Sequence, residues 1–506
     1  MDQEALLKRY DRTAPYKGVN GDLPPSMRIW PKNQSNLDQG LWPQYSLGAF
    51  PYCYRLPKYG SEYSPEPEDG ALMGQAPGTH WYHAHKHGST ALNVGNGMAG
   101  AFIIEGAYDD ELQEFYNGEL KEHVLVIQQL ETTLNLKSAG TGKPKPPFSV
   151  NGRVNPVVTM RQGEVQMWRI VNASARTFVQ FDSFEAHGPG RVKVEWRQIA
   201  QDGVQFSFDN YNDVGFVNNK FNLAAANRAD LLVKAPMHEG ERPVDYALTV
   251  VPSVSDTPGN APRVTLLTVR VTTDRIEPPM DFIQTREDFP KLPPYLEDIR
   301  GKAYTKRELV YNTDPGPGRR GQGKMPQHKI NGEQFNEEVI SAQMTLNTVE
   351  EWTMVNETLG IAHPFHIHIN PFQIVEVFQP NQNTACVDPT DPDTWKPCEK
   401  LTPPFVWWDT FAIPAAQNQD LDASVCTEKV EDCPAAIQEY TTCTAKTATA
   451  AAKCTVKIPG YFKMRSFFAD FTGEYVNHCH ILAHEDRGMM QLIEVIPRPR
   501  NLYRHQ

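Results

Sequence analysis

The chain lacks several features that would assign it at once to a broad class of protein. No apolar run approaches the roughly 20 residues that a membrane-spanning helix needs, and the mean hydropathy of -0.51 also argues against a span. Positive charge is not in excess, and the net charge of -12 argues against a nucleic-acid partner. No stretch is typical of a long amphipathic helix. The start, "MDQEALLKRYDRT", has no apolar core of a secretory signal.

Short apolar runs separated by turns are abundant instead. The 41 prolines and 34 glycines divide many runs of Val, Ile, Phe and Tyr, a pattern typical of β-sandwiches or barrels. A hydrophobic content of 40% is sufficient for packed cores, and 506 residues predict two to four domains. The sequence therefore predicts an all-β fold.

Most of the eight cysteines lie in one region of the sequence. Six fall in loops rich in Pro, Thr and Ala: Cys386, Cys398, Cys426, Cys433, Cys443 and Cys454. This even number favours disulfides and an oxidising compartment, although free thiols in a cytosolic protein are the alternative. The pairing does not follow from the sequence, and Cys53 is left over. The absence of a visible secretory signal conflicts with the disulfide interpretation.

The eighth cysteine lies between two histidines in "YVNHCHILAHEDRGMMQ", residues 475–491. Thiolate, imidazole and thioether together are typical of a blue-copper site, whereas zinc sites more often repeat Cys or His pairs. In an extended strand, His478 and His480 would both point away from Cys479. Electrons collected at the thiolate could then pass through its backbone to a second metal site.

The other histidines are clustered. "GTHWYHAHKHG" contains His80, His83, His85 and His87, and "IAHPFHIHINPF" contains His363, His366 and His368. Within each cluster some histidines are two residues apart, such as His83 and His85 or His366 and His368, and would share one face of a strand, which favours metal ligation. The isolated histidines are interpreted as ordinary surface or core residues: His123, His187, His238, His328 and His505.

Two internal repeats indicate duplicated domains. "FSVNGRVNP" followed by "VQMWRIVNAS" resembles "HKINGEQFN" followed by "VEEWTMVNET", and "WYHAHKHG" followed by "NGMAGAFIIEG" resembles "YVNHCHILAHEDRGMMQLIEV". We predict a first domain over 1–107, a second over 120–275 and a third over 305–497. The Pro-rich residues 276–304 are predicted to be a linker.

With these motifs, the chain resembles the multicopper oxidases, most closely the laccase-like and bacterial cuprous-oxidase-like branch. The resemblance runs from about residue 75 to 497 through "GTHWYHAH", "NGRVNP", "WRIVNAS", "NRADLLVK", "HPFHIH", "WWDTFAIP" and "HCHILAHEDRGMM". It implies three cupredoxin-like Greek-key β-sandwich domains, the first incomplete at its N-terminus. The second domain would hold no copper ligand.

The family pattern assigns copper ligands residue by residue. The type 1 blue-copper ligands would be His363, Cys479, His484 and Met489. His366 would bind the type 2 copper, and the type 3 pair would be bound by His83, His85, His368, His478 and His480. Cys479 would conduct electrons, and Glu485 would relay protons as a general acid, the alternative being an ordinary solvent-facing acid. His80 and His87 would have supporting or structural roles.

One family motif is missing. The first His-x-His-Gly should precede "GTHWYHAH", but residues 1–79 contain no histidine, and "NQSNLDQGLWPQ" is the nearest remnant. The deficit is one type 2 ligand and one type 3 ligand. Three explanations are open: a truncated gene product, a natural variant with a poorly bound cluster, or recruitment of His80, His87 or another chain's residue.

The resemblance implies a laccase-like enzyme that oxidises phenols, aromatic amines or cuprous ion and reduces dioxygen to water. The alternative is a blue-copper electron-transfer protein that does not reduce oxygen, and a third reading is a structural protein with vestigial ligands. We expect secretion or a periplasmic location, copper as cofactor, and small reductants and dioxygen as partners.

Overall fold

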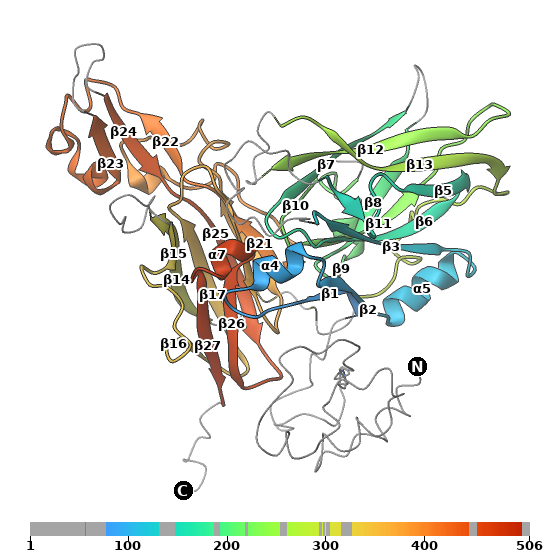
Figure 1. Cartoon of the computed structure of the whole chain (residues 1–506), viewed down its shortest axis with the longest axis horizontal. Coiled ribbons are helices and arrows are strands. Elements are labelled where there is room, and N and C mark those ends of the chain that lie inside the picture. The colour runs from blue at the N-terminus through green and yellow to red at the C-terminus, as the bar shows by residue number, and fades with distance from the viewer. Residues whose placement is uncertain are drawn as a thin grey trace, which may run out of the picture.

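The structure is a computed structural model in which β-strands predominate, as predicted (Figure 1). It describes Leu56, residues 77–130, 147–186, 193–217, 221–253 and 261–292, Leu296, Ile299, and residues 304–314, 326–444 and 453–497. Helices in this part of the chain are short, and α5 (Ala107–Phe115) has nine residues. None of the described helices is long and apolar enough to cross a membrane.

The green domain of Figure 1 is a sandwich of two sheets. The five-stranded sheet has the order β10 (Phe221–Leu223), β7 (Phe178–Ala186), β12 (Val244–Ser253), β13 (Val264–Arg275) and β5 (Val157–Gln162). The six-stranded sheet has the order β4 (Ser149–Val150), β3 (Lys121–Gln128), β6 (Val165–Asn172), β11 (Arg228–Lys234), β8 (Glu195–Gln201) and β9 (Val204–Gln205). Trp168 and Ile170 of one sheet share a core with Leu248 and Val250 of the other. A short helix, α6 (Phe208–Asn212), follows β9.

The C-terminal domain, yellow to red in Figure 1, is a second sandwich. Its six-stranded sheet has the order β15 (Gln327–Ile330), β14 (Tyr304–Asp314), β17 (Thr348–Asn356), β25 (Gly460–Phe468), β19 (Phe372–Phe378) and β20 (Trp407–Trp408). Its five-stranded sheet has the order β16 (Ile340–Thr345), β27 (Met490–Ile496), β26 (Gly473–Cys479), β18 (His363–Ile367) and β21 (Thr410–Ile413). Along β25, buried residues alternate with partly exposed ones, the period expected of a strand with one face in the core.

The two sandwiches have the same topology. β3 lies parallel to β6 as β14 lies parallel to β17, and β5 lies parallel to β13 as β16 lies parallel to β27. Asn151 and Asn331 begin equivalent turns with φ of 51° and 53°, and each side chain accepts a hydrogen bond from the neighbouring strand. The repeated Asn172 and Asn356 are the last residues of β6 and β17, and they donate to the carbonyls of Thr177 and Ile361 in the loops that follow. The sequence repeat is therefore a structural repeat.

A second copy of one hairpin of the C-terminal domain precedes the sandwiches. β1 (Gly78–His83), α4 (Thr90–Gly95) and β2 (Ala99–Ile104) match β26, α7 (Leu482–Glu485) and β27, because both pairs are antiparallel hairpins with a helix between their strands. The rest of the predicted first domain lies outside the described residues, as do Cys53 and the "NQSNLDQGLWPQ" segment. In Figure 1 the blue hairpin lies between the two sandwiches, with α4 beside α7.

Both sandwiches anchor this hairpin. On the middle domain, the Thr79 hydroxyl donates to Asp230 at 2.6 Å, and Arg228 Nε donates to the Thr79 carbonyl at 2.9 Å. On the C-terminal domain, the carboxylate of Asp486 accepts the backbone N–H groups of Thr90 and Ala91, each at 2.9 Å. The histidines that follow β1 are thereby held against the C-terminal domain.

The first part of the predicted linker packs against the middle domain, whereas Leu296 and Ile299 also contact the C-terminal domain at Val349 and Trp407. Ile283 and Phe289 join Leu112 of α5 and Leu232 of β11 in one apolar cluster. This segment therefore also holds α5 in place.

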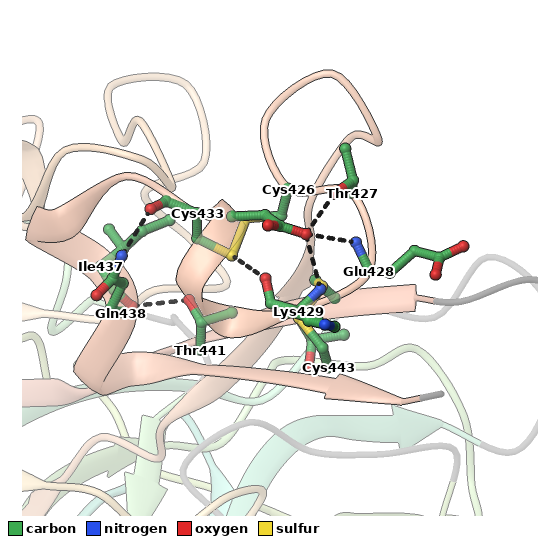
Figure 2. The surroundings of a disulfide bond; sticks show 12 residues. Cys426, Thr427, Glu428, Lys429, Cys433, Ile437, Gln438, Thr441 and Cys443 are labelled. Atoms are coloured by element: carbon green, nitrogen blue, oxygen red, sulfur yellow. Dashed lines mark hydrogen bonds between the residues drawn. A yellow bond between two sulfur atoms is a disulfide. The ribbon is translucent and has the colours of Figure 1, made fainter. Parts of the chain in front are cut away.

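The cysteine-rich insertion forms a small sheet of its own at one end of the C-terminal domain (Figure 1). Its strand order is β22 (Gln417–Asp420), β24 (Lys453–Ile458) and β23 (Thr441–Thr444), and its 3-10 helices are η4 (Val430–Asp432) and η5 (Ala435–Tyr440), with η3 (Pro392–Thr394) in the preceding loop. Three disulfides, as the even number of cysteines predicted, join Cys386 to Cys398, Cys426 to Cys433 and Cys443 to Cys454. Figure 2 shows the second of them in a turn that ends where Thr441 donates to the Ile437 carbonyl.

Candidate metal centre

Cys479 is the last residue of β26, at the centre of the five-stranded sheet. Its Sγ lies 3.4 Å from His363 Nδ1 and 3.8 Å from His484 Nδ1, and the two nitrogens lie 3.2 Å apart. A point about 2 Å from all three atoms exists inside this triangle, which is the length of a metal–imidazole bond. His363 and Cys479 are fully buried, and so is Met489, whose carbonyl accepts the Cys479 N–H at 3.0 Å. The side chains of Cys479, His363 and His484 fit a copper ion with one thiolate and two imidazole ligands, and Met489 belongs to the same buried apolar cluster as Cys479.

A second cluster lies on the opposite face of the same strand. His478 Nε2 lies 3.2 Å from His85 Nε2 and 3.3 Å from His368 Nε2. His85 follows β1, His368 follows β18 and His478 lies in β26, so three segments far apart in the sequence supply one site. Successive side chains of β26 point to opposite faces of the sheet, so His478 and Cys479 belong to different clusters, as predicted.

The second nitrogen of most of these imidazoles is held by the protein. His83 Nδ1 donates to the Ala84 carbonyl at 2.9 Å, and His366 Nδ1 donates to the Asp409 carbonyl at 2.8 Å. His363 Nε2 is hydrogen-bonded to the Thr358 hydroxyl at 2.9 Å. Each contact orients the ring and leaves the other nitrogen available as a ligand, which is how proteins usually present metal-binding histidines.

His480 completes the group of histidines in a different way. Its ring is 1% exposed, and neither nitrogen has a hydrogen-bond partner among the described residues. Its nearest ring neighbours include His83 and His366, at centroid distances of 5.2 and 5.6 Å. Two orphaned nitrogens in a buried site are costly unless a further group binds them, so His480 also fits a metal.

A cavity of about 530 Å³ adjoins this group. It is bounded by β1, by the middle domain and by the segment after β18, and its walls include His80, His83, His85, His366, His368 and Asp409. Arg228 holds the Asp409 carboxylate through two hydrogen bonds of 2.7 and 2.6 Å. Asp409 therefore fixes His366 through its carbonyl while its own side chain is fixed by the middle domain.

Burial sets the protonation of both clusters. It lowers the pKa of His83 to about 4 and those of His363 and His366 to about 3, and it lowers the pKa of His368, His480 and His484 well below the ordinary value. These imidazoles are neutral at pH 7, the form that binds metal. Burial also raises the pKa of the Cys479 thiol, so metal binding must displace its proton.

Glu485 lies between His85 and His478, two of the three histidines of the second cluster. Its carboxylate oxygens lie 3.2 Å from His478 Nδ1 and 3.5 Å from His85 Nδ1, and its side chain is fully buried. Burial alone would raise the pKa of Glu485, but His478 and His85 outweigh that effect and lower it to about 2. The alternative of an ordinary solvent-facing acid is wrong, because this carboxylate is ionised and buried against two candidate ligands.

The histidines outside the ligand pattern have different surroundings. His80 lines the cavity, and His87 is exposed with its ring against Phe335 at 5.0 Å. His187 and His505 lie outside the described residues. His328 is not an ordinary core histidine, because its ring stacks on His484 at a centroid distance of 3.9 Å. The sequence carries no sign of this contact, nor of those made by Thr358 and Asp486, since none of the three belongs to a histidine cluster.

A family model described as multicopper oxidase matches residues 311–424 and 431–499. Among curated proteins, the multicopper oxidase LPR1 homolog 5 of rice (Oryza sativa subsp. japonica) is 24% identical over 466 residues, which are 84% of this chain and 61% of that protein. A laccase of Bacillus subtilis (strain 168) is 22% identical over 456 residues, 85% of this chain and 72% of the laccase. The chain therefore spans less than two thirds of the rice protein and more than two thirds of the bacterial one.

Solved structures share the fold. The McoA multicopper oxidase of the hyperthermophile Aquifex aeolicus has a TM-score of 0.56 at 20% identity, with 83% of this chain and 76% of that chain covered. A multicopper oxidase of Campylobacter jejuni has a TM-score of 0.51 at 19% identity, with 84% and 72% covered. The family model includes both strands that bring His363 and Cys479 together, and the matched relatives extend over most of the chain. On these grounds the C-terminal domain matches the multicopper oxidase family model, and the chain as a whole is similar to multicopper oxidases and laccases over most of its length.

Proposed function

We propose that this protein is a copper-dependent oxidase that takes single electrons from a small reductant at Cys479 and uses them to reduce dioxygen to water at the histidine cluster. One observation carries the proposal: adjacent residues of β26 belong to two different clusters, Cys479 to one and His478 to the other. Bound copper would supply the one-electron redox chemistry and the binding of oxygen. The geometry supports the ligand assignment made from the sequence for both clusters.

The chain itself supplies a short connection between the two sites. His478 Nδ1 lies 3.3 Å from the carbonyl oxygen of Cys479, so the two ligands are linked by the peptide bond and by this contact. β26 pairs with β18 on one side and β27 on the other, which holds this path rigid. Rigid ligands lower the reorganisation that accompanies each change in charge.

Glu485 is proposed to orient the ligands and to relay protons. Reduction of oxygen to water consumes one proton for each electron, so a proton route must reach the buried cluster. Glu485 is an ionised carboxylate within 3.5 Å of both His85 and His478, and it can accept a proton and pass it on. Asp486, the next residue, fixes the turn by accepting two N–H groups of α4.

Phenols, aromatic amines and cuprous ion are the proposed reductants, because small one-electron donors suit a site that is closed except at one ligand. His363 and Cys479 are fully buried, whereas His484 is partly exposed, so electrons would enter at His484. The three disulfides support a secreted or periplasmic location.

A second candidate function is electron transfer by the Cys479 site without oxygen reduction. The cavity beside His83 and His366 favours this second function, because the family pattern requires two further copper ligands at that place. Apart from the histidines already assigned as ligands, the described residues of the cavity wall supply only His80 as an imidazole. Neither His80 nor His366 belongs to a group of three described side chains whose ligand atoms converge.

Oxygen uptake separates the two functions. The copper-loaded protein would be supplied with an easily oxidised phenol, beside Cys479→Ser as the matched control. Uptake that vanishes in Cys479→Ser is expected of the oxidase. A protein that shows the thiolate-to-copper absorption and is reduced by the phenol, but consumes no oxygen, would overturn the oxidase and establish the electron-transfer function.

A further inference from the structure

His328 lies directly on the candidate ligand His484. The two rings are nearly parallel, with an interplanar angle of 17° and a centroid distance of 3.9 Å. His328 belongs to β15, where it pairs with Thr313 of β14, and its Nδ1 is hydrogen-bonded to the Thr313 hydroxyl at 3.0 Å. The His328 side chain is 3% exposed, so the stack is part of the packed interior.

The other two ligands of the Cys479 cluster are fixed by hydrogen bonds. The backbone of Cys479 is tied to Met489, and the ring of His363 is tied to Thr358. The ring of His484 has no such tie within the described part of the chain, because its side-chain polar contacts are with Cys479 and His363. His484 also belongs to α7, a helix of only four residues at the edge of the site.

Ring contacts must therefore set the plane of His484. One contact is the edge of His363, at 5.1 Å and 60°, and the other is the parallel face of His328. A parallel stack restricts tilting of the ring, and the Thr313 hydrogen bond stops His328 from rotating in turn. A tilt of His484 would move its Nδ1 away from the point that Cys479 and His363 share.

We propose that His328 is a positioning residue that holds the His484 ring in the plane needed to bind copper beside Cys479. The inference rests on the proposed copper site, but it does not depend on oxygen reduction. His328 acts through His484 and contributes no ligand atom. Outer partners of this kind typically change metal affinity by roughly 10 to 100-fold when they are lost.

The test compares His328→Leu, which fills the space without an aromatic face, with His328→Phe, which keeps a flat ring. Cupric ion is the probe, its affinity for the Cys479 site is measured by competition with a chelator, and the site is characterised by electron paramagnetic resonance and by the thiolate-to-copper absorption. We expect His328→Leu to lose affinity by about tenfold or more and to change both spectra. His328→Phe retains the stack but loses the hydrogen bond to Thr313, so its affinity and spectra should lie between those of the unmodified protein and those of His328→Leu.

Two controls keep the result specific. His123→Leu alters a partly buried histidine of β3 in the other sandwich and should change neither affinity nor spectra. Thr313→Val keeps both rings but frees His328 to rotate, so it should change the spectra in the same direction as His328→Leu. This second variant serves as the test if His328→Leu does not fold.

Either of two results would overturn the proposal. One is that His328→Leu binds cupric ion with unchanged affinity and spectra, and the other is that His328→Phe is as defective as His328→Leu. Absence of oxygen uptake in the unmodified copper-loaded protein would count against the proposed oxidase function and not against this role of His328.

Discussion

The buried thiol of Cys479 should make copper binding strongly dependent on pH. Burial raises its pKa, whereas burial lowers the pKa of His363 to about 3 and that of His484 well below the ordinary value. Between pH 6 and pH 8 the copper-free site therefore holds one proton, on sulfur, and both imidazoles are neutral. Cupric ion must displace that single proton, because the thiolate is the form that binds metal.

The size of the effect follows from this proton count. Release of one proton makes the affinity rise about tenfold for each pH unit, or about 2.7 kcal/mol between pH 6 and pH 8 at 1.36 kcal/mol per unit. The assay is chelator competition followed at the thiolate-to-copper absorption, with correction for the chelator's own protons. Cys479→Ser, followed by electron paramagnetic resonance, should bind weakly and show no pH dependence above pH 6.

Two outcomes would refute this reasoning. An affinity independent of pH would mean that the Cys479 thiol is already ionised in the copper-free protein, despite its burial. A rise of two or three decades per pH unit would mean that His363 or His484 carries a proton at neutral pH. A direct count of protons released on adding cupric ion to the unbuffered protein distinguishes all three cases.

Three further perturbations test how the ligands are held. Thr358→Val removes the hydroxyl that is hydrogen-bonded to His363 Nε2, so the affinity for cupric ion in the same competition assay should fall about tenfold. An unchanged affinity would mean that packing alone orients the His363 ring. Asp486→Ala leaves two N–H groups of α4 without an acceptor, so the free energy of unfolding in urea should fall by about 1 to 2 kcal/mol, and Asp486→Asn should be intermediate. Equal stability of the unmodified protein and both variants would contradict this role of Asp486. The copper-free protein should become less stable as the pH falls below 6.5. In the unfolded chain His363 and His366 take up protons at that pH, whereas in the folded protein their pKa values of about 3 keep them neutral. At pH 5 each histidine should lower the free energy of unfolding by about 2 kcal/mol, and urea unfolding curves that coincide at pH 5 and pH 7 would refute this.

The repeats in the sequence predicted much of the fold because they record the same local physics twice. An Asn-Gly pair adopts the positive φ values that a tight hairpin requires, which is why Asn151 and Asn331 begin equivalent turns. The buried Trp168 and Trp352 then mark equivalent central strands of the two sandwiches. The hairpin of β1 and β2 resembles the segment that carries Cys479 in sequence, and the two have the same strand–helix–strand order.

Contacts between distant segments were beyond the reach of sequence reasoning. His328 was assigned an ordinary role because nothing in its neighbourhood marks it, and only the pairing of β15 with β14 brings it onto His484. The two hydrogen bonds from α4 to Asp486 link residues almost 400 positions apart. The disulfide partners likewise depend on the path of the inserted loops, although the even number of cysteines was informative.

The alternation of a strand explains why the ligands have the spacing they have. Phe365 is paired with Cys479 and His366 with His478, so the neighbouring strands β18 and β26 present the same faces in register. Residues of odd number in this part of β18 face the thiolate side, and residues of even number face the histidine cluster. His363 therefore joins Cys479, while His366 and His368 lie with His478 and His480. One pair of strands thus contributes ligands to two sites of different chemistry, and the path between the sites is short because those ligands are adjacent in β26.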